Sequence, residues 1–459
     1  MARTLPCLVT VFFVLFAIPL VPASSAQDTA PGSDARTITF NEAIQLALEN
    51  NAGLRQARNE IDGRSSAVTQ RRSDFLPNLT ASFSGSQRFG TTFDTNVGGF
   101  VDESTLVASA SLSSSVNVFD GFGNIARLRT AQINLEQSEL DLQRTEQDVI
   151  FEVMSQYLDI ILSKENVRIQ EENLQSQKQQ LEQTEEFVRV GMQPQSDLFQ
   201  QEAQVASAEL ALLQAERQFQ VNQVQLIRTL QLDPFEMYEF DVITIEEDDL
   251  SIEQYALDTL MQQAFDRRPD LQSEERSIAS SEQGIREARS GYFPSVSLNA
   301  SSSGSFTDQL DGFSFADQVF DARRTESIGL QVSIPIFDRL QTRNQVQQAR
   351  VQRENARLSY EDQRQNIAVQ VREAYLDLMS AEKELDVTRA QERAAERALE
   401  ATQERYNLGA ATLVELTQAQ SEFVDASSNR VQARYEYVFQ QRLIDYYVGI
   451  LDPTQPLFD

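Results

Sequence analysis

The chain has 459 residues, of which 39 are basic and 69 acidic, and its formal net charge is −30; it contains no histidine and a single cysteine, Cys7. This composition excludes histidine-based catalysis, cysteine-rich zinc sites and intramolecular disulfides. The acidic balance also excludes a nucleic-acid interface built on a basic surface. We therefore expect no enzyme activity, no cofactor, no metal site and no nucleic-acid partner.

Residues 1–26 have the pattern of a secretory signal peptide. Arg3 and the amino terminus supply positive charge, an apolar run follows from about residue 8 to residue 20, and Ser24-Ser25-Ala26 offers a cleavage site. Cys7 precedes the apolar run, so a lipid anchor at this cysteine is not expected. Farther along, no stretch approaches 18 consecutive apolar residues, so any membrane role has to come through β-strands.

The rest of the chain is a tandem duplication, because ordered landmarks recur at an offset of 217 to 219 residues. Examples are 116-VNVFDGFG-123 with 334-IPIFDRLQ-341 and 232-LDP-234 with 451-LDP-453. We divide the chain into the signal peptide (1–26), a first repeat (27–234), an acidic linker (235–254), a second repeat (255–453) and a short C-terminal tail (454–459). Each repeat is predicted to run helix, strand, strand, helix, helix.

Strands are predicted at about 78–88, 105–118, 295–305 and 326–336, where apolar residues alternate with Ser, Gly, Asn and Thr. Their length suits a tilted bilayer-crossing strand. These strands could instead form half of a soluble β-sandwich. The polar face of the strands carries few charges, which argues against this alternative. Because open sheet edges are not tolerated in lipid, the chain must oligomerise. Three chains would supply twelve strands, although closure alone admits other numbers.

The connections between these strands, about 87–104 and 305–325, are expected to be exposed loops.

Two very long helices are the main α signal. No proline occurs from residue 122 to 190, and at about 1.5 Å per residue this stretch would measure roughly 100 Å. Apolar residues recur every seven positions, which predicts long antiparallel coiled coils. After the first turn this row contains Leu198, Val205, Leu212, Phe219 and Leu226, and in the second repeat Leu416, Phe423, Tyr437 and Ile444, with Arg430 interrupting it.

These features together resemble the outer membrane efflux protein family, the TolC-like channels of tripartite efflux and type I secretion systems. The resemblance covers about residues 37–453. It rests on the signal peptide, the order of elements in both repeats, the FDGFG motif after a strand, and VG followed six residues later by an acid. It implies a mainly α fold with a small β part, in which three chains form a twelve-stranded transmembrane β-barrel and a long α-barrel.

The same resemblance implies what the protein does. It implies a homotrimer in outer membrane lipid that extends into the periplasm of a Gram-negative-type bacterium. Such a duct would conduct substrates passively, with a periplasmic adaptor (a membrane fusion protein) and an inner-membrane transporter of the RND or ABC class as partners.

The helix turns, at about 191–196 and 409–412, would form the periplasmic tip, where the channel closes and the adaptor docks. Gly191 and Gly409 match the family's turn glycine, which ends a helix. Ser196 and Asp197 are expected to cap the next helix in the first repeat, and Thr412 in the second.

Glu415 aligns with Asp197 and with an acid on the inner tip helix of related channels. Three copies around the axis would repel one another or bind a cation. An acid that is simply favoured by the helix dipole explains Glu415 equally well, and it is the better explanation for Asp197.

The tip also departs from the family pattern. Ala411 stands where relatives carry an arginine that ties the tip shut, and Gln418 stands where a second acid can occur, whereas Tyr406 is retained. We therefore expect closure to rest on packing and on hydrogen bonds of Tyr406.

Three alternatives remain beside an efflux duct. The same duct would serve as the outer membrane component of type I protein secretion. A structural, trimeric coiled-coil surface protein would leave the β segments unexplained, and a periplasmic enzyme built on carboxylates would need paired acids that the sequence does not group. The sequence names neither the exported substrate nor the pump.

Overall fold

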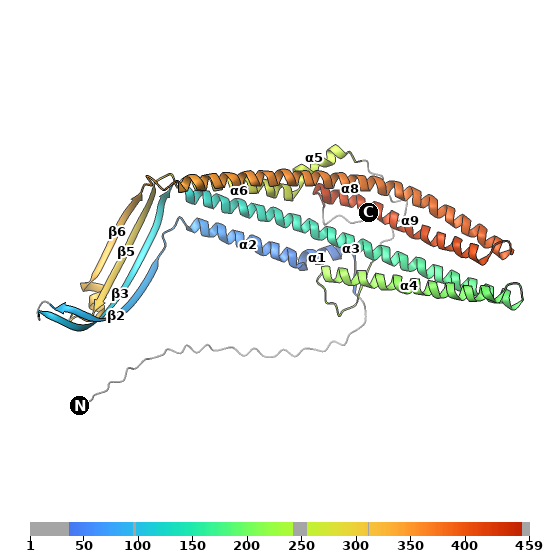
Figure 1. The fold of residues 1–459 in the computed structure, drawn as a ribbon, viewed down its shortest axis with the longest axis horizontal. Helices are drawn as coiled ribbons and strands as arrows, with labels where there is room; N and C mark the ends of the chain where they lie inside the picture. Colours follow the sequence, from blue (N-terminus) through green and yellow to red (C-terminus); the bar gives the residue numbers. More distant parts are fainter. Residues whose placement is uncertain (1–35, 95–97, 242–254, 311, 452–459) are drawn as a thin grey trace, which may run out of the picture.

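A computed structural model describes residues 36–94, 98–241, 255–310 and 312–451. The predicted signal peptide, most of the acidic linker and the C-terminal tail lie outside these ranges. A sheet occupies one end of the molecule, and long helices extend from it as a rod that ends in two hairpin tips (Figure 1). Among the described residues, no helix combines the length and the apolar character needed to cross a membrane.

The sheet confirms the four predicted strands. β2 (Thr80–Asp94), β3 (Gly99–Asp120), β5 (Ser295–Thr307) and β6 (Arg324–Ser333) are antiparallel in the order β2-β3-β5-β6. One face carries paired serine hydroxyls, such as Ser82 with Ser111 at 2.7 Å. The other face is apolar and open, with Phe83 and Ile328 more than 80% exposed. A single chain therefore leaves both an apolar face and two strand edges uncovered.

The β2–β3 hairpin is longer than expected: the loop predicted at 87–104 is wrong, because most of this segment is strand, although it is exposed as expected. The ladder continues to the pair Asp94–Gly99. The Phe93 and Phe100 rings meet edge to face at 5.3 Å, and Thr91 Oγ1 donates to Asp102 Oδ1 at 2.6 Å. Apolar–polar alternation fades beyond residue 88, so the pattern predicted no strand where cross-strand pairs stabilise the ladder.

The second connection is also folded, which corrects the exposed loop expected at 305–325. It contains the short helix α7 (Phe315–Asp317) and the π-helical turn η2 (Gln318–Ala322). The fully buried Gln318 side chain accepts from the Thr307 N–H at 3.0 Å and donates to its carbonyl at 3.1 Å. A Cβ at Gly304 would lie 1.8 Å from the Val319 carbonyl oxygen, so only glycine lets this turn lie against β5.

Four helices lead away from the sheet in the order α2-α3-α6-α8 (Figure 1). They are α2 (Ala52–Ser73), α3 (Gly123–Arg189), α6 (Pro269–Ser290) and α8 (Gln341–Asn407). α3 and α8 each have 67 residues, or about 100 Å. α3 folds back onto α4 (Gln195–Thr229), and α8 onto α9 (Leu413–Val448), which confirms the predicted antiparallel coiled coils.

The duplicated FD motif explains how each long helix begins. The carboxylate of Asp120 accepts a hydrogen bond from the Asn124 N–H at 2.7 Å, and that of Asp338 accepts from Thr342 N–H at 2.8 Å. Phe122 and Leu340, the residues just before the two helices, have φ of 70° and 65°. The two repeats thus use the same strand-to-helix turn.

The main hydrophobic core lies at the middle of the rod. There β1 (Arg36–Ile38) and β4 (Tyr238–Phe240) pair in parallel beside α1 (Phe40–Asn50), α5 (Leu257–Arg267) and the long helices. The buried Tyr157 hydroxyl donates to the Asp241 carbonyl at 2.5 Å. Burial raises the pKa of Tyr157, with the nearby Asp241 carboxylate adding to the rise, so the phenol stays neutral and can donate.

A buried ion pair ties the second repeat together in this region. Arg268 is only 2% exposed, and its guanidinium donates to both carboxylate oxygens of Asp270, at 3.0 and 2.6 Å, and to Gln370 at 2.8 Å. Burial opposes ionisation of Asp270, but the hydrogen bonds and charge of Arg268 outweigh it and hold the pKa of this carboxyl below its ordinary value.

Candidate functional site

The two helix turns at the far end of the rod have the same C-terminal geometry. At the first, Gly191 has φ +78°, its N–H bonds to the Val188 carbonyl, and the next N–H bonds to the Phe187 carbonyl. At the second, Gly409 has φ +70°, and the equivalent bonds reach Tyr406 and Arg405. This double bond pattern is a Schellman motif, which confirms that a glycine ends each long helix.

The returning helices begin differently. Thr412 is the N-cap of α9, as predicted, and its hydroxyl accepts from the Glu415 N–H at 3.3 Å. The Glu415 carboxylate in turn accepts from the Thr412 N–H at 2.8 Å, which completes a capping box.

The expectation that Ser196 and Asp197 cap α4 is wrong. The helix begins one residue earlier, at Gln195, with Pro194 in the N-cap position and no side-chain cap. Ser196 and Asp197 therefore lie inside the first turn, where the Ser196 hydroxyl donates to the Asp197 carboxylate at 3.2 Å. Asp197 N–H bonds to the Pro194 carbonyl at 3.1 Å, so the fixed φ of proline starts this helix through its backbone alone.

Tyr406 connects the two turns of one chain. Its side chain is only 3% exposed and packs with Leu413 and Leu416 in a small apolar cluster that Leu399 and Ala411 border. Its hydroxyl oxygen lies 3.0 Å from Gln193 Nε2, which donates to it from the first turn. Beside it, Gln183 on α3 donates to the Asn407 side chain at 3.0 Å. The sequence singled out Tyr406 but not Gln193, its partner.

The cap acid Glu415 also faces a basic residue that the sequence analysis missed. Arg405 donates to the Ala410 carbonyl at 3.1 Å, and its guanidinium lies 3.9 Å from the second Glu415 carboxylate oxygen. Both side chains are about half exposed, so this ion pair is weak. A basic residue in the last turn before a C′ glycine is the signal that marks Arg405. This arginine thus stabilises its own turn, next to Ala411.

Gln418 does not join this cluster. Its amide is exposed and donates to Glu422 at 2.8 Å, one helical turn along α9. The structure thus pairs Thr412 with Glu415 in the first turn of α9, the helix whose Leu413 and Leu416 pack on Tyr406. It leaves Gln418, Ser196 and Asp197 outside the contacts around Tyr406.

Polar layers join the coiled coils behind the tip. On α4 the deepest row is Gln201, Ala208, Ala215 and Asn222, which repeats every seven residues but lies three residues after the apolar row expected from the sequence. Gln201 Nε2 donates to Gln177 Oε1 at 2.8 Å. In this single chain most of the apolar row is only half-buried. Small and amide side chains therefore set the spacing of the α3–α4 pair.

Arg430, which interrupts the apolar row of the second repeat, is paired. Its guanidinium bonds to the Glu392 carboxylate across the α8–α9 hairpin, where the Glu392 side chain is 16% exposed. The charge of Arg430 is thus compensated by an acid on the facing helix.

The fold and the tip define a class of protein: a tandem-repeat membrane channel with bilayer-length strands at one end and paired helical hairpins at the other. The chain belongs to the outer membrane efflux protein family, whose model matches residues 43–230 and 260–449. As a member of this family, it is an outer membrane channel that extends into the periplasm.

Individual relatives are similar at low identity over most of the chain. Outer membrane protein TolC of Vibrio cholerae is 23% identical over 423 residues, which are 89% of this chain and 90% of that protein. Protein CyaE of Bordetella pertussis is 25% identical over 422 residues, 89% of this chain and 84% of that protein. A match to TolC of Salmonella enteritidis, also 25% identical, spans only 43% of this chain and 40% of that protein.

Solved structures share the fold. The Campylobacter jejuni CmeC outer membrane channel superposes with a TM-score of 0.75 at 20% identity and covers 96% of this chain and 95% of its own. The open state of the Neisseria gonorrhoeae MtrE outer membrane channel gives a TM-score of 0.73 at 19% identity, with 96% and 99% coverage.

Proposed function

We propose that three copies of this chain form one passive export duct. The observation that carries this proposal is the sheet: its apolar face is exposed, and β2 and β6 each have one unpaired edge. Pairing of β6 of one copy with β2 of the next would satisfy both edges, and three copies would close a barrel of twelve strands. The order α2-α3-α6-α8 places helices α2 and α8 at the matching edges, so the same contact would close the helical part.

The duct would act as the outer component of a tripartite system. A periplasmic adaptor would dock on the two turns, over the surface defined by Gly191, Ser196, Asp197, Tyr406, Gly409, Thr412, Glu415 and Gln418. An inner-membrane transporter of the RND or ABC class would supply the energy. Closure of the tip would rest on the Tyr406 cluster and its bond to Gln193, rather than on an arginine at position 411.

Protein secretion is the second candidate, because one relative is described by its name as a secretion protein: alkaline protease secretion protein AprF of Pseudomonas aeruginosa, 22% identical over 41% of this chain. The transport partner would decide between the two uses. Deleting the gene of an RND pump or of an ABC exporter in the source bacterium, and measuring which loss reproduces loss of this channel, separates them.

Fractionation and conductance test the duct itself. We expect a heat-resistant trimer in outer membrane fractions that conducts ions after reconstitution in planar bilayers. A soluble monomer, or a trimer that does not conduct in any tip variant, contradicts the proposal.

A further inference from the structure

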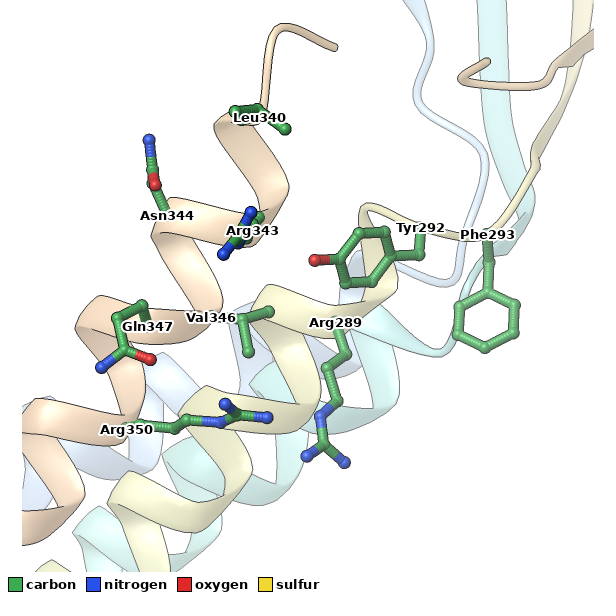
Figure 2. A pocket seen from close by; sticks show the side chains of 9 residues that line it. All are labelled: Arg289, Tyr292, Phe293, Leu340, Arg343, Asn344, Val346, Gln347 and Arg350. Carbon is green, nitrogen blue, oxygen red and sulfur yellow. The ribbon is translucent and has the colours of Figure 1, made fainter. Parts of the chain in front are cut away.

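A cavity of about 740 Å³ lies between α6 and α8 where the helices meet the strands, and three arginines line it (Figure 2). Arg289 comes from the last turn of α6, and Arg343 and Arg350 come from the first turns of α8. Figure 2 shows the Arg350 side chain reaching from α8 toward α6 and the Tyr292 ring reaching from the end of α6 toward α8.

The charges in this cavity are not neutralised by the protein. Within the described ranges, no carboxylate lies within ion-pair distance of Arg289, Arg343 or Arg350, and all three side chains are exposed. The surroundings are basic too, since residues 338–357 contain five arginines and two acids in a chain with 39 basic and 69 acidic residues. Although the protein is acidic overall, unpaired arginines are therefore concentrated where α6 and α8 meet the strands.

This junction of helices and strands adjoins an exposed apolar surface. Ile334, Ile336 and Phe337, the residues between β6 and α8, are 63%, 96% and 77% exposed. They come directly before Leu340 and the arginines of α8. In Figure 1 this junction is the place where the rod of helices meets the sheet. A molecule bound here would meet cationic groups and apolar side chains within a few residues of each other.

We propose that this pocket binds the headgroup of an anionic phospholipid from the membrane leaflet next to the helices. Guanidinium groups bind phosphate oxygens in a planar, forked geometry, and Tyr292 offers a further hydroxyl. The acyl chains would lie along the apolar side chains between β6 and α8. Each arginine near an anionic surface strengthens lipid binding by about fivefold, so the three together contribute about 100-fold. The inference does not depend on what the duct exports.

Lipid retention by the full-length assembly tests this proposal. The protein is purified in neutral detergent, incubated with phosphatidylglycerol or phosphatidylcholine, and examined by native mass spectrometry. We expect retained phosphatidylglycerol, little phosphatidylcholine, and about 100-fold weaker phosphatidylglycerol binding in the variant R289Q/R343Q/R350Q. The control R393Q/R397Q, which changes exposed arginines farther along α8, should bind as the parent does.

A second variant, R289K/R343K/R350K, keeps the three positive charges and serves as a control for loss of assembly. It should retain phosphatidylglycerol better than the glutamine variant, because lysine keeps the positive charge although it lacks the forked geometry of the guanidinium group. Equal retention by the parent and the glutamine variant overturns the proposal. Displacement of the lipid by millimolar inorganic phosphate overturns it in favour of a free-anion site. Dissociation of the assembly in both variants overturns it in favour of a contact between subunits.

Discussion

The bond between Tyr406 and Gln193 gives the most direct test of the proposed closure of the tip. Tyr406→Phe removes one hydroxyl from a side chain that is 3% exposed and keeps the ring packed against Leu413 and Leu416. A neutral hydrogen bond contributes about 1 kcal/mol net. Three copies in a trimer that opens as a unit would then lose about 3 kcal/mol, or roughly 100-fold in the ratio of closed to open channels.

Single-channel recording in planar bilayers measures this shift. We expect Tyr406→Phe to raise the mean conductance and the open probability. Tyr446→Phe is a matched control, because Tyr446 is also a buried tyrosine whose hydroxyl makes a side-chain hydrogen bond, to Asp148 at 2.8 Å, but it lies far from the turns. Gln193→Leu should open the channel to a similar degree, and the double variant should add little to either single change. Unchanged conductance and gating in Tyr406→Phe would refute the reasoning.

Three further predictions concern stability. Thr412→Ala should cost about 1 kcal/mol through loss of the cap and speed amide exchange at the start of α9, whereas Ser196→Ala, which caps nothing, should leave exchange at α4 unchanged. Gly409→Ala should destabilise by about 1 kcal/mol in thermal melting because φ is +70°, while Gly63→Ala within α2 should be neutral or stabilising; equal effects would contradict this. Asp270→Asn should cost about 3 kcal/mol by leaving Arg268 buried and unpaired. Because the folded pKa of Asp270 is lowered, its contribution should be complete above the ordinary value of 3.8 and disappear as the pH falls through the folded pKa. The exposed control Asp386→Asn should melt as the parent does.

The elements with a strong period were predictable from sequence. Period two located the four strands, and the absence of proline and glycine located helices of 67 residues. Turn chemistry was predictable where one residue type dominates, as at Gly191, Gly409 and Thr412. These features depend on local sequence, so one chain read in isolation is enough to find them.

The features that the sequence did not predict depend on contacts between distant segments. Gln193 has no local signal, because its role comes from Tyr406, 213 residues away in sequence. The buried row on α4 was missed because it contains glutamine, alanine and asparagine, which a search for heptads of large apolar residues does not detect. The cap at Pro194 was missed because the nearby Ser196 and Asp197 are better N-cap residues by preference.

The two turns have diverged in a way that bears on the proposed gating. The second turn is held by its own capping box, by Arg405 and by the Tyr406 cluster, whereas the first begins α4 without a side-chain cap. Bonds within a turn survive any motion that moves the turn as a unit. A tip that opens by parting the two turns therefore breaks the contacts of Tyr406 with Gln193 and of Asn407 with Gln183, and keeps both glycine caps intact. The first turn, with fewer contacts of its own, is the part that yields most readily in such a motion.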